Sequence, residues 1–167
     1  MANAHDVASY ILECYTEGGH GAMSTWKLQK LAYYSQAWSL VWDDNRLFPE
    51  DIEAWANGPV VRELYLRHRG QFKVTDWRWG NVNALEDYER DTIEAVVNGY
   101  GKLSGRQLSF LTHQEAPWQV AREGLAPTES SRNVISLDSM YEFYSALDAD
   151  RRAEPVEEID WSELESP

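Results

Sequence analysis

The segment between Ser24 and Asp43 constrains the fold most, because its apolar side chains do not lie on one side only. Leu28, Leu31 and Ala32 have helical spacing. Aromatic residues lie on more than one side of the same helix; they are Trp26, Tyr33, Tyr34 and Trp38, of which Trp38 shares the face of Leu28 and Leu31. A helix that is apolar all round is stable when other elements cover it on every side. The sequence therefore predicts a central, buried helix.

Most of the remaining chain also has helical periodicity. The first helix is expected to end before Gly18, and Ser104 is expected to cap a later one. The helices predicted beside the central one cover residues 4–15, 60–69, 85–100, 105–113, 117–123 and 137–147. Residues 71–83 and 124–135 are expected to be loops, because they are rich in turn-forming residues. The predicted fold is mainly α, a compact single-domain helical bundle.

One section interrupts the helical pattern. Residues 47–56 include a proline and then alternate with period two, which favours a short strand or hairpin. The Asn57-Gly58-Pro59 sequence that follows predicts a turn. Gly58 is expected at positive φ, and Pro59 is expected at the first position of the next helix, where a missing N–H is tolerated.

Composition limits the class of protein. The 167 residues suit one domain, and the single cysteine, Cys14, allows no internal disulfide, as is usual in a reducing cytoplasm. No apolar run approaches the roughly 18 residues of a membrane span, and no signal peptide is expected. The net charge of −13 disfavours nucleic acid as a partner. It either steers the protein towards a basic partner or only maintains solubility.

The chain divides by composition after Leu147. Residues 148–167 hold eight acidic and two basic residues, a net charge of −6, around Val156, Ile159, Trp161 and Leu164. We expect a domain over residues 1–147 and an acidic C-terminal tail over residues 148–167. The tail either orders on binding a partner, with Trp161 as its anchor, or packs this tryptophan on its own domain.

The sequence gives few indications of catalysis. The glycines between Gly18 and Gly21 lack the Lys-Ser/Thr ending of a phosphate-binding loop, and the four histidines lack metal-ligand spacing. We therefore expect no enzyme, no cofactor and no metal. An unrecognised enzyme would use His113 and Glu115 as an acid–base couple, although a single histidine at a helix end more often caps or packs.

A DNA-binding regulator is a further alternative. It would need a basic recognition helix, and the dense basic stretch of the chain is Arg62, Arg67, His68 and Arg69.

The central helix and the turn together resemble a known family. Lys27-Leu28-Gln29-Lys30-Leu31-Ala32-Tyr33-Tyr34 is followed by Glu53-Ala54-Trp55-Ala56-Asn57-Gly58-Pro59-Val60, and this combination is similar to the Panacea domain of SocA-like antitoxins. The resemblance covers roughly residues 4–147. The residues that carry it are Lys27, Leu28, Lys30, Leu31, Tyr33, Tyr34, Gln36, Trp38, Glu53, Ala54, Trp55, Gly58, Pro59, Val60, Thr112, His113, Pro117 and Trp118.

The resemblance implies an antitoxin of a two-gene toxin–antitoxin system, in bacteria or their phages, with phage defence as a possible setting. Its partner would be a cognate protein toxin, neutralised by direct stoichiometric binding; delivery of the toxin to a cellular protease is the alternative. The net charge of −13 leads us to expect that the toxin has a basic surface. The candidate toxin-binding residues are Trp161, Ile159, Leu164, Trp77 and Trp79. The toxin class and the oligomeric state are left open.

Overall fold

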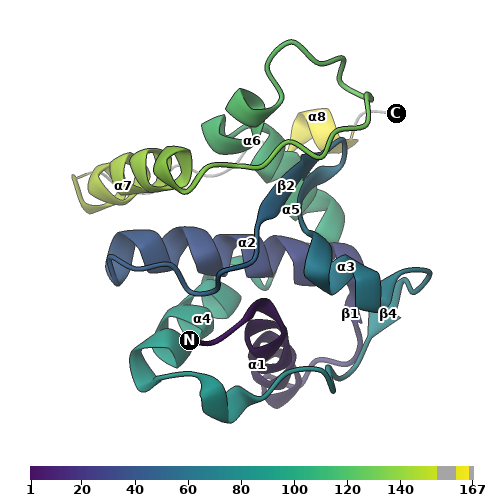
Figure 1. Cartoon of the computed structure of the whole chain (residues 1–167), viewed down its shortest axis with the longest axis vertical. Coiled ribbons are helices and arrows are strands. Elements are labelled where there is room, and N and C mark those ends of the chain that lie inside the picture. The colour runs from purple at the N-terminus through teal and green to yellow at the C-terminus, as the bar shows by residue number, and fades with distance from the viewer. Residues whose placement is uncertain (154–160, 166–167) are drawn as a thin grey trace.

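The computed structural model describes residues 1–153 and 161–165 and is mainly α-helical, with two small two-stranded sheets (Figure 1). The helices are α1 (Ala4–Glu17), α2 (Thr25–Trp42), α3 (Arg62–His68), α4 (Asp87–Tyr100), α5 (Gly105–His113), α6 (Ala116–Ala121), α7 (Leu137–Ala153) and α8 (Ser162–Glu165), with a 3₁₀ turn η1 (Val82–Ala84). The strands are β1 (Met23–Ser24), β2 (Ile52–Trp55), β3 (Gly58–Val61) and β4 (Lys73–Val74). The predicted fold class, a helical domain with a short hairpin, is confirmed.

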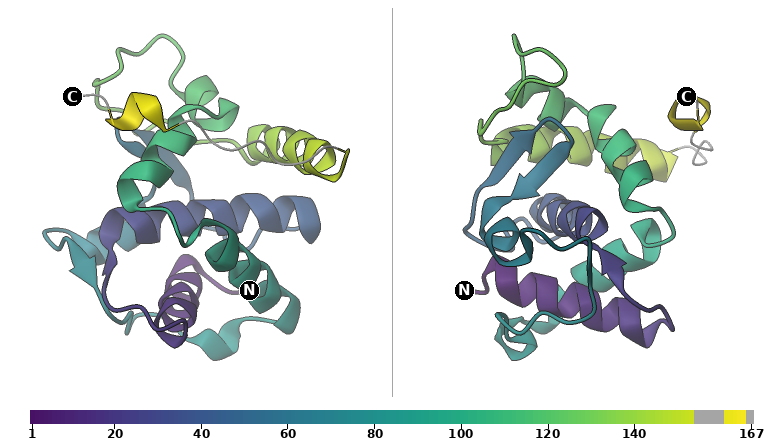
Figure 2. Two further views of the ribbon diagram at one scale, coloured as in Figure 1. Left: turned by 180° about the vertical axis from the view of Figure 1, so that it is seen from behind. Right: turned by 90° about the vertical axis from the view of Figure 1, so that its right-hand side faces the viewer.

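Helix α2 is the centre of the molecule, as its all-round apolar surface predicted. It begins where the Ser24 hydroxyl accepts a hydrogen bond from the Lys27 amide, and it ends at Asp43. Helices α1, α4, α5 and α7 and strand β3 all pack against it. Figure 2 shows α7 running along α2 on the side away from α1. Because α2 is enclosed in this way, even polar side chains on it are buried.

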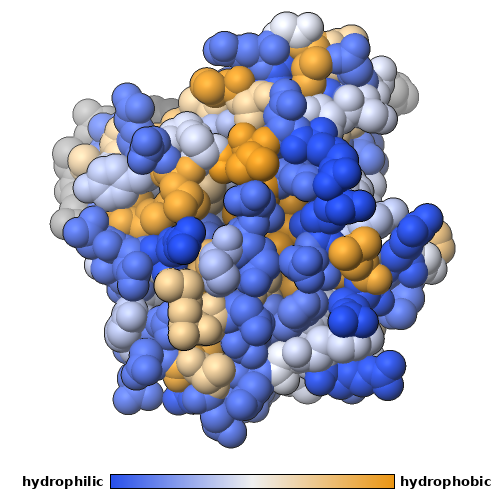
Figure 3. Space-filling view, viewed as in Figure 1, coloured by the Kyte–Doolittle hydropathy of each residue, from blue (hydrophilic) through white to orange (hydrophobic). Residues whose placement is uncertain are grey.

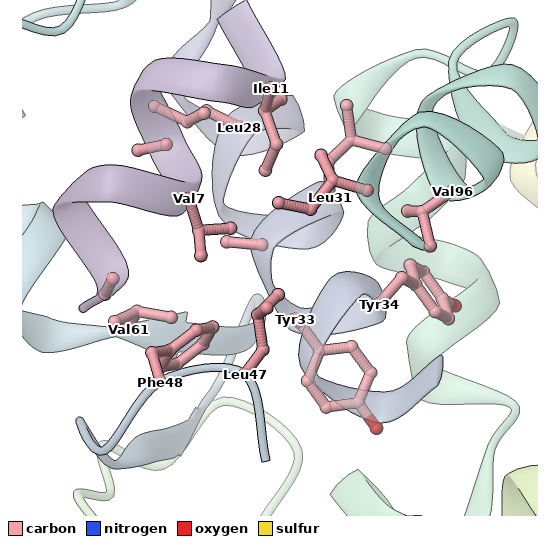
Figure 4. Close-up of a cluster of buried hydrophobic side chains, with 14 of the residues drawn as sticks. Val7, Ile11, Leu28, Leu31, Tyr33, Tyr34, Leu47, Phe48, Val61 and Val96 are labelled. Atoms are coloured by element: carbon pink, nitrogen blue, oxygen red, sulfur yellow. The ribbon is translucent and has the colours of Figure 1, made fainter. Parts of the chain in front are cut away.

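The core forms where α1 and α4 meet α2. Val7 and Ile11 of α1 lie against Leu28 and Leu31 of α2, and Val96 of α4 approaches from another side (Figure 4). All five side chains are buried. The helical spacing of α1 and α4 thus reflects contact with one common partner helix.

Strands β2 and β3 form an antiparallel hairpin in place of the predicted strand, turn and helix. Trp55 pairs with Gly58, and Gly58 has a φ of 120°, which confirms the predicted positive φ. The expected helical start at Pro59 is wrong, because Pro59 lies in β3 opposite Ala54 and α3 begins only at Arg62. The β-branched Val61 pairs with Ile52 instead of entering a helix.

Two further expectations differ from the structure. The segment 71–83, expected as loop, contains β4, which pairs with β1. Helix α7 continues to Ala153, six residues beyond its expected end. Contacts with α2 explain the longer helix, since the Arg151 guanidinium lies 5.6 Å from the Trp38 ring centroid and the Trp42 indole N–H donates to Asp148. The division at residue 147 stays a prediction.

Candidate functional site

The hairpin β2–β3 is held by side-chain donors from the surrounding helices. Its backbone carbonyls accept hydrogen bonds one after another along the chain. The pairs are Arg122 Nη1 to Ala54 at 2.8 Å, Trp118 Nε1 to Trp55 at 2.8 Å, Ser109 Oγ to Asn57, Lys30 Nζ to Pro59 at 3.1 Å, and Gln29 Nε2 to Val61 at 3.1 Å. Buried carbonyls that are paired in this way fix the hairpin relative to α2, α5 and α6.

Gly58 is required by space as well as by φ. A Cβ atom at this position would lie 2.7 Å from Lys30 Cε and 3.1 Å from Thr112 Oγ1. The glycine therefore lets the turn approach the side chain of Lys30 closely. In this way the structure brings together Lys30, Gly58, Pro59 and Thr112, which the sequence places in three separate motifs.

A cavity of about 520 Å³ opens beside this turn. Lys30 and Gln29 of α2 reach it from the core. Four aromatic side chains line it: Trp26, Trp55, Tyr65 and Phe72. Trp26 is 46% exposed and Phe72 is 88% exposed, whereas Trp55 and Tyr65 contact each other edge to face with centroids 4.8 Å apart. The cavity thus combines an apolar, aromatic mouth with a polar interior.

Lys30 is the unusual polar group of this cavity. The residue is 2% exposed, and Nζ makes one hydrogen bond, to the Pro59 carbonyl. Within the described residues, no carboxylate lies within 4 Å of this nitrogen. Burial lowers the pKa of Lys30 to about 7, because the charged form is poorly solvated. Burial also lowers the pKa of His68 and of His113, and the charge of Lys30 adds to both shifts.

A second buried ionisable group is Glu115, the N-cap residue of α6. Its Oε1 accepts hydrogen bonds from the hydroxyls of Tyr34 at 2.6 Å and Tyr144 at 2.8 Å, and Tyr33 contacts Tyr144 at 3.0 Å. Tyr100 stacks on Tyr34 with centroids 4.1 Å apart. Burial raises the pKa of Glu115 to about 7. We call Glu115, Tyr33, Tyr34, Tyr100 and Tyr144 the tyrosine cluster.

His113 and Glu115 do not form the acid–base couple that the enzyme alternative would use. The His113 ring stacks on Trp118 with centroids 4.1 Å apart, while the Glu115 carboxylate is engaged by the two tyrosine hydroxyls. No hydrogen bond joins the two residues, so the geometry gives this pair a role in packing.

The other family-motif residues serve the core and the hairpin. The side-chain amide of Gln36 donates to the carbonyl of Phe48 at 2.8 Å and accepts from the Leu47 amide at 2.6 Å. Glu53 accepts from the Trp55 indole at 2.8 Å and pairs with Arg132 at 3.5 Å. The residues that are buried in or beside the core are Lys27, Leu28, Leu31, Tyr33, Trp38, Ala54, Val60 and Pro117.

The candidate toxin-binding residues lie in two places. Trp77 is 4% exposed and donates to His5 Nδ1, so it has little surface to offer, whereas the adjacent Trp79 is half-buried and stacks under Arg67 and Arg78. Trp161 is half-buried, with its ring 6.0 Å from that of Phe110 on α5. The Leu164 carbonyl accepts a hydrogen bond from the Arg106 guanidinium at 3.4 Å. Ile159 lies outside the described residues. Toxin contact by these residues stays a prediction.

The basic stretch of the DNA-binding alternative does not present one continuous face. His68 is buried and lies 2.9 Å from Gln29 Nε2, and the Arg67 guanidinium lies over Trp79. Arg62 and Arg69 are exposed. Because α3 has only seven residues, it offers a short surface compared with a recognition helix.

The sequence motifs did not include several residues that the site uses. Arg122 is buried and donates to the carbonyls of Ala54, Ala126 and Glu129, and Tyr144 closes the tyrosine cluster from α7. Arg122 belongs to a short helix predicted from Pro117 at its start and Gly124 at its end, and Tyr144 belongs to the last predicted helix, with no role assigned to it. The residues next to an arginine in the sequence do not indicate which carbonyls it will bind when it is buried, because tertiary packing determines those partners.

The fold and the site define an α-helical domain built around a clamped hairpin and an aromatic cavity. The family model of the antitoxin SocA-like Panacea domain matches residues 28–119, more than half of the chain, and the protein belongs to this family. No curated protein and no solved structure matches the chain significantly. In the parts of the chain that the structure describes, no helix combines the length and the apolar character needed to cross a membrane.

Proposed function

We propose that this protein is an antitoxin that neutralises a cognate protein toxin in the cytoplasm by direct, stoichiometric binding. The observation that carries the proposal is its membership of the SocA-like Panacea family, which the match over residues 28–119 establishes. The matched segment contains most of the central helix, the whole hairpin and three of its side-chain donors, Lys30, Ser109 and Trp118. A hairpin held this firmly is a rigid element suited to recognising a folded partner.

Charge and exposed aromatics support binding of a protein. The net charge of −13 favours encounter with a toxin that has a basic surface. The Trp161 ring lies near that of Phe110 on α5, and the Leu164 carbonyl accepts a hydrogen bond from Arg106 of the same helix. Trp79 lies beside Arg67 of α3. We propose these half-buried side chains as toxin contacts, because interface anchors are enriched in tryptophan.

A titration with purified components tests this function. The toxin is the product of the adjacent reading frame, and its activity is measured at a fixed concentration while the antitoxin is added. Direct binding predicts an endpoint at a fixed molar ratio, without a protease. Complete protection at a thousandth of the toxin concentration would contradict binding as the mechanism, since ordinary turnover could achieve it. Protection only when a protease is supplied would identify an adaptor.

Truncation after Ala153 tests the tail. This cut spares the whole of α7, including the contact of Arg151 with Trp38. We expect faster dissociation of the toxin and unchanged unfolding of the domain. The matched control is Tyr88→Ala, which removes an exposed aromatic side chain of α4. Unchanged affinity and salt dependence after truncation would show that the tail does not contact the toxin.

A further inference from the structure

The described residues contain three buried cationic side chains of lysine or arginine, and they differ in how well they are compensated. Arg122 donates to three backbone carbonyls and lies over the Trp118 ring. Lys27 donates to the Gly101 carbonyl and contacts both the hydroxyl and the ring of Tyr15. Lys30 has the Pro59 carbonyl alone, although an ammonium group has three donors. A buried charge in this position is costly until a counter-charge or an acceptor reaches it.

The space next to Lys30 is large enough to supply that partner. A volume of about 520 Å³ falls in the range of small-molecule sites. Its aromatic lining, Trp26, Trp55, Tyr65 and Phe72, suits the flat face of a ring system. Two of these aromatic side chains, Trp26 and Phe72, are exposed in the structure, so a ring bound at the mouth would cover apolar surface.

The lining of the cavity differs in charge from the chain as a whole. Among the described residues that line it none is an aspartate or glutamate, and Lys30 is a cation in its interior, whereas the whole chain has a net charge of −13. Figure 3 shows strongly hydrophilic side chains around smaller apolar patches on this side of the molecule. Arg132 also lines the cavity and is paired with Glu53. A local positive field of this kind attracts anions to the opening.

We propose that this cavity binds a small aromatic anion: a planar ring system with one carboxylate, phosphate or sulfonate group, which pairs with the Lys30 ammonium while the ring lies among Trp26, Trp55, Tyr65 and Phe72. The site is independent of the toxin, and neither the family match nor the proposed function requires it. Because Lys30 also donates to Pro59, the bound anion would stabilise the turn at Gly58.

The test compares two fluorescent probes that differ in charge. 8-Anilinonaphthalene-1-sulfonate has the required ring and anion, and N-phenyl-1-naphthylamine has the same rings without the sulfonate. Binding to the full chain is followed by fluorescence at pH 6, where Lys30 is charged. We expect one sulfonate probe per chain, bound at least tenfold more tightly than the neutral probe. Equal affinities, several bound probes per chain or no binding would overturn the proposal.

Variants locate the probe. Lys30→Met should weaken the sulfonate probe at least tenfold and leave the neutral probe within about twofold. Trp26→Ala combined with Phe72→Ala should weaken both probes, and both positions are exposed, so this variant tests the site even where Lys30→Met does not fold. The matched control is Tyr141→Ala, an exposed aromatic of α7 outside the cavity. Equal loss in this control, or no loss in the Trp26 and Phe72 variant, would overturn the proposal.

Discussion

Lys30 and Glu115 are both buried beside the contact between α2 and α5, yet the protein treats the two groups differently. The Glu115 carboxylate accepts hydrogen bonds from two tyrosine hydroxyls and lies among aromatic rings. The Lys30 ammonium donates a hydrogen bond to one carbonyl and lines a cavity. Burial shifts both pKa values to about 7, from opposite directions. A buried group that accepts hydrogen bonds from two elements of the fold ties those elements together, and a buried group with one partner beside a cavity is available to a ligand.

The two groups are also connected. Tyr34, which bonds Glu115, follows Lys30 by four residues on α2, so the side chains lie one helical turn apart on the same face. On the opposing side, Thr112 approaches the turn at Gly58 and Glu115 follows three residues later. The tyrosine cluster therefore positions α2, the helix from which Lys30 reaches the cavity.

The largest expected effect comes from breaking the tyrosine cluster. Glu115→Ala leaves the hydroxyls of Tyr34 and Tyr144 without their acceptor and creates a cavity, so we expect a loss of about 4 kcal/mol in the free energy of unfolding. Urea denaturation measures this loss. Glu115→Gln retains a carbonyl acceptor and should cost only about 1–2 kcal/mol. Equal costs for the two variants would contradict a hydrogen-bonding role for this carboxyl group.

The second prediction uses the opposite signs of the two pKa shifts. Between pH 4.5 and 7 the unfolded chain loses the Glu115 proton while the folded chain keeps it, so the contribution of this group to stability falls as pH rises. Between pH 7 and 9.5 the unfolded chain keeps the Lys30 proton while the folded chain has lost it, so the contribution of Lys30 rises with pH. Each change amounts to about 3 kcal/mol.

Matched variants separate these contributions. The stability of wild type relative to Glu115→Gln should fall between pH 4.5 and 7 and then level off. Relative to Lys30→Met, wild-type stability should rise above pH 7. Urea denaturation at half-unit pH intervals gives both curves. The Lys30 curve is read above pH 7, where His68 and His113 are neutral, because the charge of Lys30 contributes to their lowered pKa values and its removal changes their titration. Two flat difference curves would show that neither carboxyl nor amine is perturbed by burial.

The sequence predicted the helices that carry Lys30 and Glu115 more accurately than it predicted the contacts between elements. Helices α1, α2 and α5 were predicted from spacing and from caps such as Ser104, whose signals are local. Strand β3 was mistaken for a helix start, because Val60 and Val61 suit either structure until Gln29 of α2 binds the backbone of Val61. The pairing of β1 with β4 joins two-residue strands about fifty residues apart and leaves no periodic pattern.

The candidate site was predictable in its parts and not in its assembly. Lys30, Gly58 and Trp118 stand in the family motifs, but spacing along the chain does not indicate that all three meet at the hairpin. Phe72 belongs to a segment expected as loop, and its place at the cavity mouth follows from the β1–β4 pairing that positions it.

The third prediction concerns the close approach of the turn to Lys30. Gly58→Ala places a Cβ atom 2.7 Å from Lys30 Cε and imposes a φ of 120° on an L residue. We expect a loss of about 2–3 kcal/mol in the free energy of unfolding, part from backbone strain and part from the steric clash. In a Lys30→Ala background the clash disappears and the loss should drop to about 1–2 kcal/mol. The same loss in both backgrounds would show that the side chain of Lys30 does not crowd the turn.

The smallest expected effect is the one that separates the two groups most clearly. Lys30→Met keeps most of the volume of the side chain, removes a poorly compensated charge and gives up one hydrogen bond to Pro59. The desolvation that is relieved, about 3 kcal/mol from the pKa shift of Lys30, exceeds the hydrogen bond that is lost, worth about 1 kcal/mol. At pH 7 we therefore expect Lys30→Met to raise the free energy of unfolding by about 2 kcal/mol, against a loss of about 4 kcal/mol for Glu115→Ala. If Lys30→Met lowered the free energy of unfolding as much as Glu115→Ala does, both groups would be needed for the fold. A residue that serves a ligand contributes little to the stability of the ligand-free protein.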